Sequence, residues 1–166
     1  MTQPPPKNYL HLPLGERAPD EINVVVEIPE GCKNKYEYDK TYDIFRLDRA
    51  LHSPIHYPGD YGFAPQTLAL DGDPLDVLIL VIQPTFPGCL VVARPIGLLE
   101  MLDEGKSDDK VVAVQVGEPA LFVRPTNDGH TVDLGGRFER ALQRSVEKFH
   151  GKTSTSSSAG ASRRAG

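Results

Sequence analysis

The sequence predicts a mainly β protein, a small β-barrel with one amphipathic helix near the C-terminal end. Apolar runs of Val, Ile and Leu, each only a few residues long, alternate with turns such as Pro87-Gly88 and Glu104-Gly105. Short apolar runs separated in this way are typical of strands. We expect strands at residues 22–28, 44–47, 77–82, 90–93, 96–101, 111–116 and 121–123.

The helix is predicted from apolar side chains that recur near the end of the chain. Phe138, Leu142, Val146 and Phe149 follow one another at intervals of four, four and three residues. A helix of 3.6 residues per turn places side chains with this spacing on one face. We therefore expect one amphipathic helix in this segment.

The chain of 166 residues is long enough for a single core, and we expect one domain with a tail at each end. Residues 1–8 are rich in proline and polar side chains, and residues 151–166 contain no large apolar side chain. Such segments bury too little surface to offset their ordering entropy. The prediction is a flexible tail over 1–8, a barrel domain over 9–150 and a disordered tail over 151–166.

Composition excludes several classes of protein. The formal net charge of -5 disfavours a nucleic-acid partner, because that binding depends on a basic surface. The longest aliphatic run, 77–82, is far shorter than the roughly 20 residues of a membrane-spanning helix. The N-terminal residues do not resemble a secretion signal, so we expect a cytoplasmic protein. Cys32 and Cys89 are predicted to be ordinary reduced thiols.

Three carboxylates stand close together in Asp71-Gly72-Asp73-Pro74-Leu75-Asp76, directly before the most apolar predicted strand. Carboxylates that converge repel one another unless a cation or protons offset their charge. Mg²⁺ prefers oxygen ligands and is often completed by substrate phosphate oxygens. The same residues also suit a plain turn, because Gly72 can take a positive φ and Pro74 stiffens the exit. On this segment alone the two interpretations are about equal.

A second acidic segment, residues 103–110, links the predicted strands 96–101 and 111–116. It could face the first segment across the mouth of the barrel, which favours a metal site. Taken by itself, a run of charges of this kind is more often a solvated hairpin loop.

Basic side chains stand beside acidic ones at Lys35, Arg49 and Lys110, a mixture that suits a phosphoryl substrate. Each of them taken singly fits an ordinary surface ion pair better. Residues 56–63 add three aromatic rings around a Pro-Gly turn. We interpret Tyr57 and Phe63 as packing residues.

Several motifs together resemble those of family I soluble inorganic pyrophosphatases. The acidic segment matches that family's Asp-x-Asp-Pro-x-Asp motif followed by an aliphatic residue, here Val77. Further matches follow in the family's order and approximate spacing over residues 9–116. They are Val24 to Pro29, Lys35-Tyr36-Glu37, Asp48-Arg49, Tyr57 to Gly62, Arg94 to Gly97 and Asp103 to Lys110.

The resemblance implies Mg²⁺-dependent hydrolysis of pyrophosphate to two phosphates, and an OB-like five-stranded barrel flanked by helices. It implies Asp73 as the catalytic base that takes a proton from the attacking water. It implies phosphate contacts from Lys35, Arg49, Tyr61 and Lys110, and metal binding by Asp71, Asp76, Asp103 and Asp108, supported by Glu27 and Glu37. It also implies a cytoplasmic homohexamer.

The chain departs from the family at its C-terminal helix. Members usually carry a Tyr-Lys pair there that contacts phosphate, and the matching register here contains Phe149-His150. Residues 116–136 also fit the family poorly. Two alternatives therefore stay open: a catalytically weakened homologue with a role in assembly or regulation, and a non-enzymatic OB-type binding module.

Overall fold

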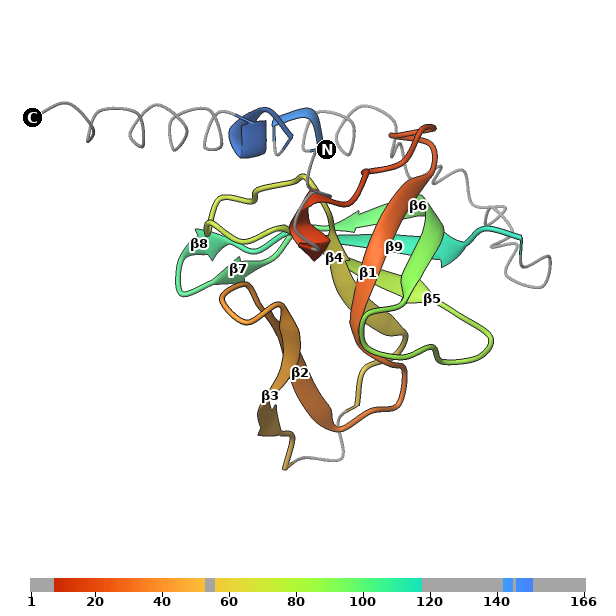
Figure 1. The fold of residues 1–166 in the computed structure, drawn as a ribbon, viewed down its shortest axis with the longest axis vertical. Coiled ribbons are helices and arrows are strands. Elements are labelled where there is room, and N and C mark those ends of the chain that lie inside the picture. The colour runs from red at the N-terminus through yellow and green to blue at the C-terminus, as the bar shows by residue number, and fades with distance from the viewer. Residues whose placement is uncertain (1–7, 53–55, 118–141, 145, 151–166) are drawn as a thin grey trace, which may run out of the picture.

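A closed five-stranded barrel forms the centre of the chain (Figure 1). The computed structural model describes residues 8–52, 56–117, 142–144 and 146–150. Around the barrel the strands follow the order β1 (Ile22–Ile28), β4 (Asp60–Ala64), β5 (Leu75–Leu80), β9 (Lys110–Gln115) and β6 (Leu90–Leu99). The predicted fold class, a mainly β protein with an OB-like five-stranded barrel, is confirmed.

Neighbouring barrel strands are antiparallel except for β5 and β9, which run parallel. The register of this parallel pair places Asp76 beside Lys110. Because β9 follows the second acidic segment directly, its pairing with β5 brings the two acidic segments of the sequence to one end of the barrel.

Strands β5 and β9 lie within one or two residues of their predicted bounds, whereas β6 and β4 differ from the prediction. Residues 90–93 and 96–101 were expected to be separate strands, but residues 90–99 form the single strand β6, with an irregular register between Pro95 and Gly97. Proline has no N–H to donate to a ladder, and a bulge lets the strand continue past it. Strand β4 was not predicted, because residues 56–63 suggested an aromatic turn.

Gly62 explains how β4 fits against β1. A Cβ atom at this position would overlap the carbonyl oxygen of Val25 on the neighbouring strand. Only glycine allows the two backbones to approach so closely. Gly62 disfavours the prediction of a strand from the sequence, but it is needed for the packing of β4 against β1.

Two hairpins extend the barrel. Strands β2 (Asn34–Asp39) and β3 (Ile44–Ala50) form one, which projects from the barrel at the lower end of Figure 1. Strands β7 (Leu102–Asp103) and β8 (Lys106–Ser107) form the other. Its two turn residues, Glu104 and Gly105, both have positive φ, as tight hairpin turns require. The hairpin interpretation of residues 103–110 is confirmed, whereas β2 was not predicted.

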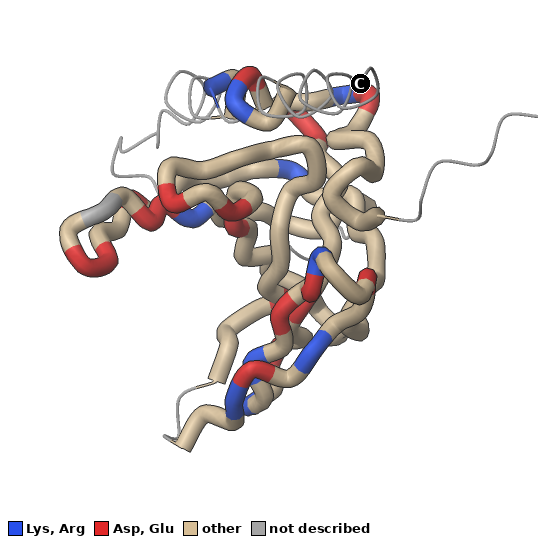
Figure 2. The backbone as a smooth tube through the Cα atoms, turned by 60° about the vertical axis from the view of Figure 1, so that its left-hand side comes forward, with Lys and Arg blue, Asp and Glu red and all other residues tan. Residues whose placement is uncertain are grey.

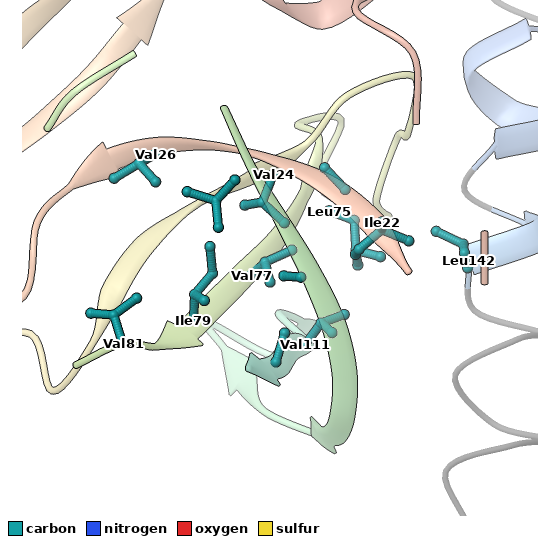
Figure 3. Close-up of a cluster of buried hydrophobic side chains, with 13 residues drawn as sticks. Ile22, Val24, Val26, Leu75, Val77, Ile79, Val81, Val111 and Leu142 are labelled. Atoms are coloured by element: carbon teal, nitrogen blue, oxygen red, sulfur yellow. The ribbon is translucent and has the colours of Figure 1, made fainter. Parts of the chain in front are cut away.

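The barrel interior is filled by aliphatic side chains that alternate along the strands (Figure 3). Leu142 is buried against this cluster and Val146 packs beside it, so the described part of the C-terminal helix covers one end of the core. Residues 142–144 and 146–150 are helical, which confirms the predicted helix for these residues. Phe138, the strand expected at 121–123 and the tails over 1–7 and 151–166 lie outside the described residues.

A second, aromatic cluster joins the β2–β3 hairpin to the barrel. Tyr38 of β2 lies within 5.8 Å, between ring centres, of Tyr9, Phe45 and Phe63. Tyr9 belongs to a short 3-10 helix, η1 (Tyr9–His11), that precedes the barrel. The cluster confirms Phe63 as a packing residue. It also holds the hairpin beside β1, which leaves a cavity between the two.

Candidate active site

The cavity lies between the β2–β3 hairpin, strands β1, β4 and β5, and the loop that leads into β5. Its volume is about 240 Å³. Acidic and basic side chains line it together; they are Glu27, Lys35, Glu37, Lys40, Asp71, Asp73 and Asp76. Charges of both signs are likewise interleaved along the hairpin (Figure 2). All of these charged residues except Lys40 were predicted site residues, and the predicted Tyr61 also lines the cavity. Seven of the eleven predicted site residues therefore meet here.

The loop over residues 65–74 presents Asp71 and Asp73. The buried hydroxyl of Thr67 donates to the Ala64 carbonyl at 2.6 Å and accepts from the Leu75 N–H at 2.8 Å, which closes the base of the loop. At the tip, the Asp73 N–H donates to the Asp71 carboxylate at 3.0 Å, and Gly72 has a φ of 98°. The segment is thus a turn of the predicted kind that also carries two carboxylates into the cavity wall.

Asp76 is the most strongly hydrogen-bonded carboxylate of the site. Its Oδ2 accepts from the Tyr61 hydroxyl at 2.6 Å and from the Lys110 ammonium at 2.6 Å. Burial raises the pKa of Asp76 above its ordinary value, although the bonds from Lys110 and Tyr61 act against the shift. Burial likewise raises the pKa of Tyr61, and the Asp76 charge adds to that shift, so this phenol is a hydrogen-bond donor at neutral pH.

Lys110 joins the two acidic segments. Its ammonium lies 2.8 Å from Asp108 as well as 2.6 Å from Asp76, and 5.6 Å from the centre of the Tyr61 ring. Burial alone would lower the pKa of Lys110, but its bonds to Asp108 and Asp76 outweigh burial and raise it. Lys110 is therefore a fixed positive charge between two carboxylates.

Glu27 is a partly buried carboxylate on β1 that faces β2. Its Oε1 accepts the Tyr38 N–H at 2.8 Å, which ties the hairpin to the barrel. The pKa of Glu27 is raised to about 7, mainly by burial; the Tyr38 bond acts against this shift, and the charges of Asp76 and Glu37 add to it. When the pKa of a carboxyl group is near 7, any cation that enters the cavity stabilises its ionised form.

Lys35 and Arg49 lie opposite each other on the hairpin. The Lys35 ammonium is 2.6 Å from Glu37 and 3.8 Å from Asp48, and it lines the cavity. Arg49 pairs with Asp48 at 3.0 Å and does not line the cavity. Asp48 thus connects the two basic side chains, with Arg49 on the outer side.

Comparison with known proteins agrees with this geometry. The family model "Inorganic pyrophosphatase" matches residues 24–156. A Synechocystis protein named inorganic pyrophosphatase is 51% identical over 130 residues, which cover 76% of this chain and 77% of the relative. This chain belongs to the inorganic pyrophosphatase family. The recognition made from the motifs is confirmed.

Solved pyrophosphatase structures share the fold. The crystal structure of the enzyme from Thermus thermophilus has a TM-score of 0.68 at 43% identity and covers 86% of this chain and 77% of its own. That from Neisseria gonorrhoeae has a TM-score of 0.73 at 30% identity, with 86% of this chain and 99% of its own covered. Similarity therefore extends over most of this pyrophosphatase chain.

Membership of the family implies a divalent metal cofactor. The oxygen donors of Glu27, Asp71 and Asp76 line one cavity, and burial raises the pKa of Glu27 and of Asp76. Hard cations such as Mg²⁺ prefer oxygen ligands, so the donor chemistry fits. Within the described residues, no three His, Cys, Asp or Glu side chains converge into a preassembled metal site. The assignment of individual ligands stays a prediction.

The predicted residues outside the cavity wall are Arg49, Asp103, Asp108 and Lys110. Asp108 and Lys110 still reach the site, because Lys110 bonds to Asp76. Asp103 lies exposed in β7, where its register partner is Lys106. The expectation that residues 103–110 face the first acidic segment therefore holds for Asp108 and Lys110, while Asp103 does not line the cavity.

Sequence reasoning missed Lys40 and Tyr36, which also line the cavity. Lys40 lies just beyond β2 and pairs with Asp73 at 3.1 Å. In residues 34–40, the tyrosines at 36 and 38 alternate with charged side chains. If β2 had been recognised as a strand, this alternation would have indicated that these residues could line the site.

The C-terminal departure from the family lies partly within the described residues. Phe149 places its ring 5.5 Å from the ring of His11, and 5.7 Å from that of His150. Phe149 does not line the cavity. In this pyrophosphatase Phe149 therefore has a packing contact with η1.

No helix in the described part of the chain is long and apolar enough to cross a membrane.

We expect Tyr61→Phe to lower kcat/KM for pyrophosphate by about tenfold to a hundredfold. The change removes one hydrogen bond to a carboxylate, an interaction of about 1.5–3 kcal/mol, while the ring keeps its contact with Tyr57 at 5.2 Å. Steady-state phosphate release measures the effect. The exposed Tyr42→Phe is a matched control, and equal rates for both variants would contradict a role for the Tyr61 hydroxyl.

Proposed function

We propose that this chain hydrolyses inorganic pyrophosphate to two phosphates and uses Mg²⁺ as its cofactor. One observation carries the proposal: one small cavity in a pyrophosphatase fold is lined by several carboxylates, two of them partly buried, together with the ammonium groups of Lys35 and Lys40. Pyrophosphate is a compact, highly charged anion, and hydrolysis requires that its charge be neutralised at both phosphates. A site of mixed charge, with room for cations and donors for phosphate oxygens, matches that requirement.

The carboxylates would hold the cation. Asp71, Asp76, Asp103 and Asp108 are the proposed ligands, supported by Glu27 and Glu37. When bound there, Mg²⁺ would neutralise phosphate oxygens and lower the pKa of an attacking water. Glu27 favours this arrangement, since its pKa of about 7 lets it release a proton at neutral pH when a positive charge arrives.

The remaining side chains would bind the substrate and move the proton. Lys35 lines the cavity, and the Lys110 ammonium and the Tyr61 hydroxyl both donate to Asp76, a carboxylate of the cavity wall. We assign them, with Arg49, to phosphate oxygens. Asp73 would accept the proton from the attacking water, because its carboxylate lines the cavity and is 71% exposed. The homohexamer and the cytoplasmic location implied by the resemblance stay predictions.

The direct test is phosphate release from pyrophosphate with and without Mg²⁺. We expect steady release in millimolar Mg²⁺, loss of nearly all activity after chelation with EDTA, and recovery when Mg²⁺ is returned. Circular dichroism before and after chelation would show that the chain stays folded. Absence of release in excess Mg²⁺ would contradict the proposed function, and release unaffected by EDTA would contradict the cofactor.

A further inference from the structure

Lys40 occupies the turn between β2 and β3, at the edge of the cavity. Its ammonium lies 3.1 Å from Oδ1 of Asp73, which belongs to the loop before β5. Both residues line the cavity. The pair therefore joins the hairpin to the loop across the cavity, through the carboxylate proposed as the catalytic base.

The turn that carries Lys40 is held by its own hydrogen bonds. The Asp39 carboxylate accepts the N–H groups of Thr41 and Tyr42 at 2.9 and 3.2 Å. Asp43 has a φ of 55°, and its carboxylate accepts the Tyr38 hydroxyl at 2.7 Å. A turn bonded on both sides presents its side chains from a defined backbone position.

The Asp73 side of the pair is equally well defined. The Asp73 carbonyl accepts the Ala69 N–H at 2.6 Å, and its own N–H is bonded to Asp71. The backbone of Asp73 is thus fixed, while its carboxylate is 71% exposed and has room to rotate. Contact with Lys40 selects one orientation of that carboxylate, with Oδ1 toward the hairpin.

From this geometry we infer that Lys40 is a positioning residue for Asp73, holding its carboxylate in the orientation needed to accept a proton from the attacking water. The inference rests on the proposed function. Lys40 is 48% exposed, and an ion pair between exposed groups contributes little to folding. Its removal should therefore affect turnover and leave stability nearly unchanged.

The test compares Lys40→Met with the unmodified chain in Mg²⁺. We expect kcat to fall roughly tenfold, a part of the about 10²–10⁴-fold that a well-placed general base contributes. KM and the affinity for methylenediphosphonate, measured by calorimetry, should change less than about twofold. Lys40→Arg should recover most of kcat, because it restores the charge beside Asp73. Arg17→Met, which removes an exposed ion pair of 3.0 Å away from the cavity, is the matched control.

A double-mutant cycle separates positioning from other roles. In an Asp73→Asn background, Lys40→Met should have almost no further effect on kcat, because the group that it positions is already lost. A tenfold fall in both backgrounds, or a weaker affinity for methylenediphosphonate, would show that Lys40 acts on the substrate and would overturn the inference. If the unmodified chain is active and Lys40→Met leaves its kcat unchanged, only the inference about Lys40 is overturned. If the unmodified chain itself is inactive, the proposed function is overturned as well.

Discussion

Replacing Asp73 by Asn is expected to lower kcat for pyrophosphate by roughly 10²–10⁴-fold, the range attributed to a general base. The amide cannot accept the proton from water, but it keeps the size of the side chain. Because the Asp73 side chain is 71% exposed, its replacement should leave the melting temperature nearly unchanged. Steady-state phosphate release measures the loss.

Mg²⁺ binding, followed by calorimetry on the same variant, tells a base from a ligand. If Asp73 is the base, Asp73→Asn should bind Mg²⁺ about as well as the unmodified chain. Equal losses of binding and turnover would make Asp73 a metal ligand instead. Asp20→Asn, a change at an exposed carboxylate outside the cavity wall, controls for the loss of one negative charge.

The largest expected effect on stability comes from Asp60, whose side chain is fully buried at the start of β4. Its carboxylate accepts the Glu30 N–H at 2.8 Å, the Thr85 N–H at 3.0 Å and the Thr85 hydroxyl at 2.6 Å. Asp60→Ala would leave three donors without their acceptor. Since each unsatisfied buried group costs about 1–3 kcal/mol, we expect a loss of about 3–5 kcal/mol.

Urea denaturation of Asp60→Ala would measure the change in free energy of unfolding, and thermal denaturation should show a fall on the order of 10 °C. Asp60→Asn is the matched control, because its amide keeps the shape and one carbonyl oxygen. We expect Asn to recover a substantial part of the loss. A variant with Ala that melts within about 2 °C of the unmodified chain would contradict the bonding role of Asp60.

Strands were predictable where local pattern and tertiary environment agree. β1 is rich in buried β-branched residues and was predicted with its observed bounds of Ile22–Ile28. β4 was missed because Gly62 and the preceding Pro-Gly pair favour a turn in any local measure. What makes β4 a strand is its fit between β1 and β5, where Val25 leaves no space for a side chain at position 62. That information is not local.

The candidate site was predictable in its parts. Acidic residues next to an apolar strand indicated a cation site, and the basic residues among them indicated a phosphoryl substrate. The sequence pattern could not show that Asp103 lies exposed on a hairpin while Asp108, five residues later, bonds to Lys110. The direction of each side chain depends on where β8 ends and β9 begins, which pairing with β5 and β6 decides.

The class of the fold, the family and the acidic loop could be predicted from residue order, because they follow from short-range alternation and from motifs of neighbouring residues. Which charges meet depends on the folded arrangement. Lys110 reaches Asp76 across 34 positions of the chain, and Lys40 reaches Asp73 across 33. Such contacts are set by strand register and by the docking of a hairpin on a barrel, and these depend on packing between distant segments rather than on the order of neighbouring residues.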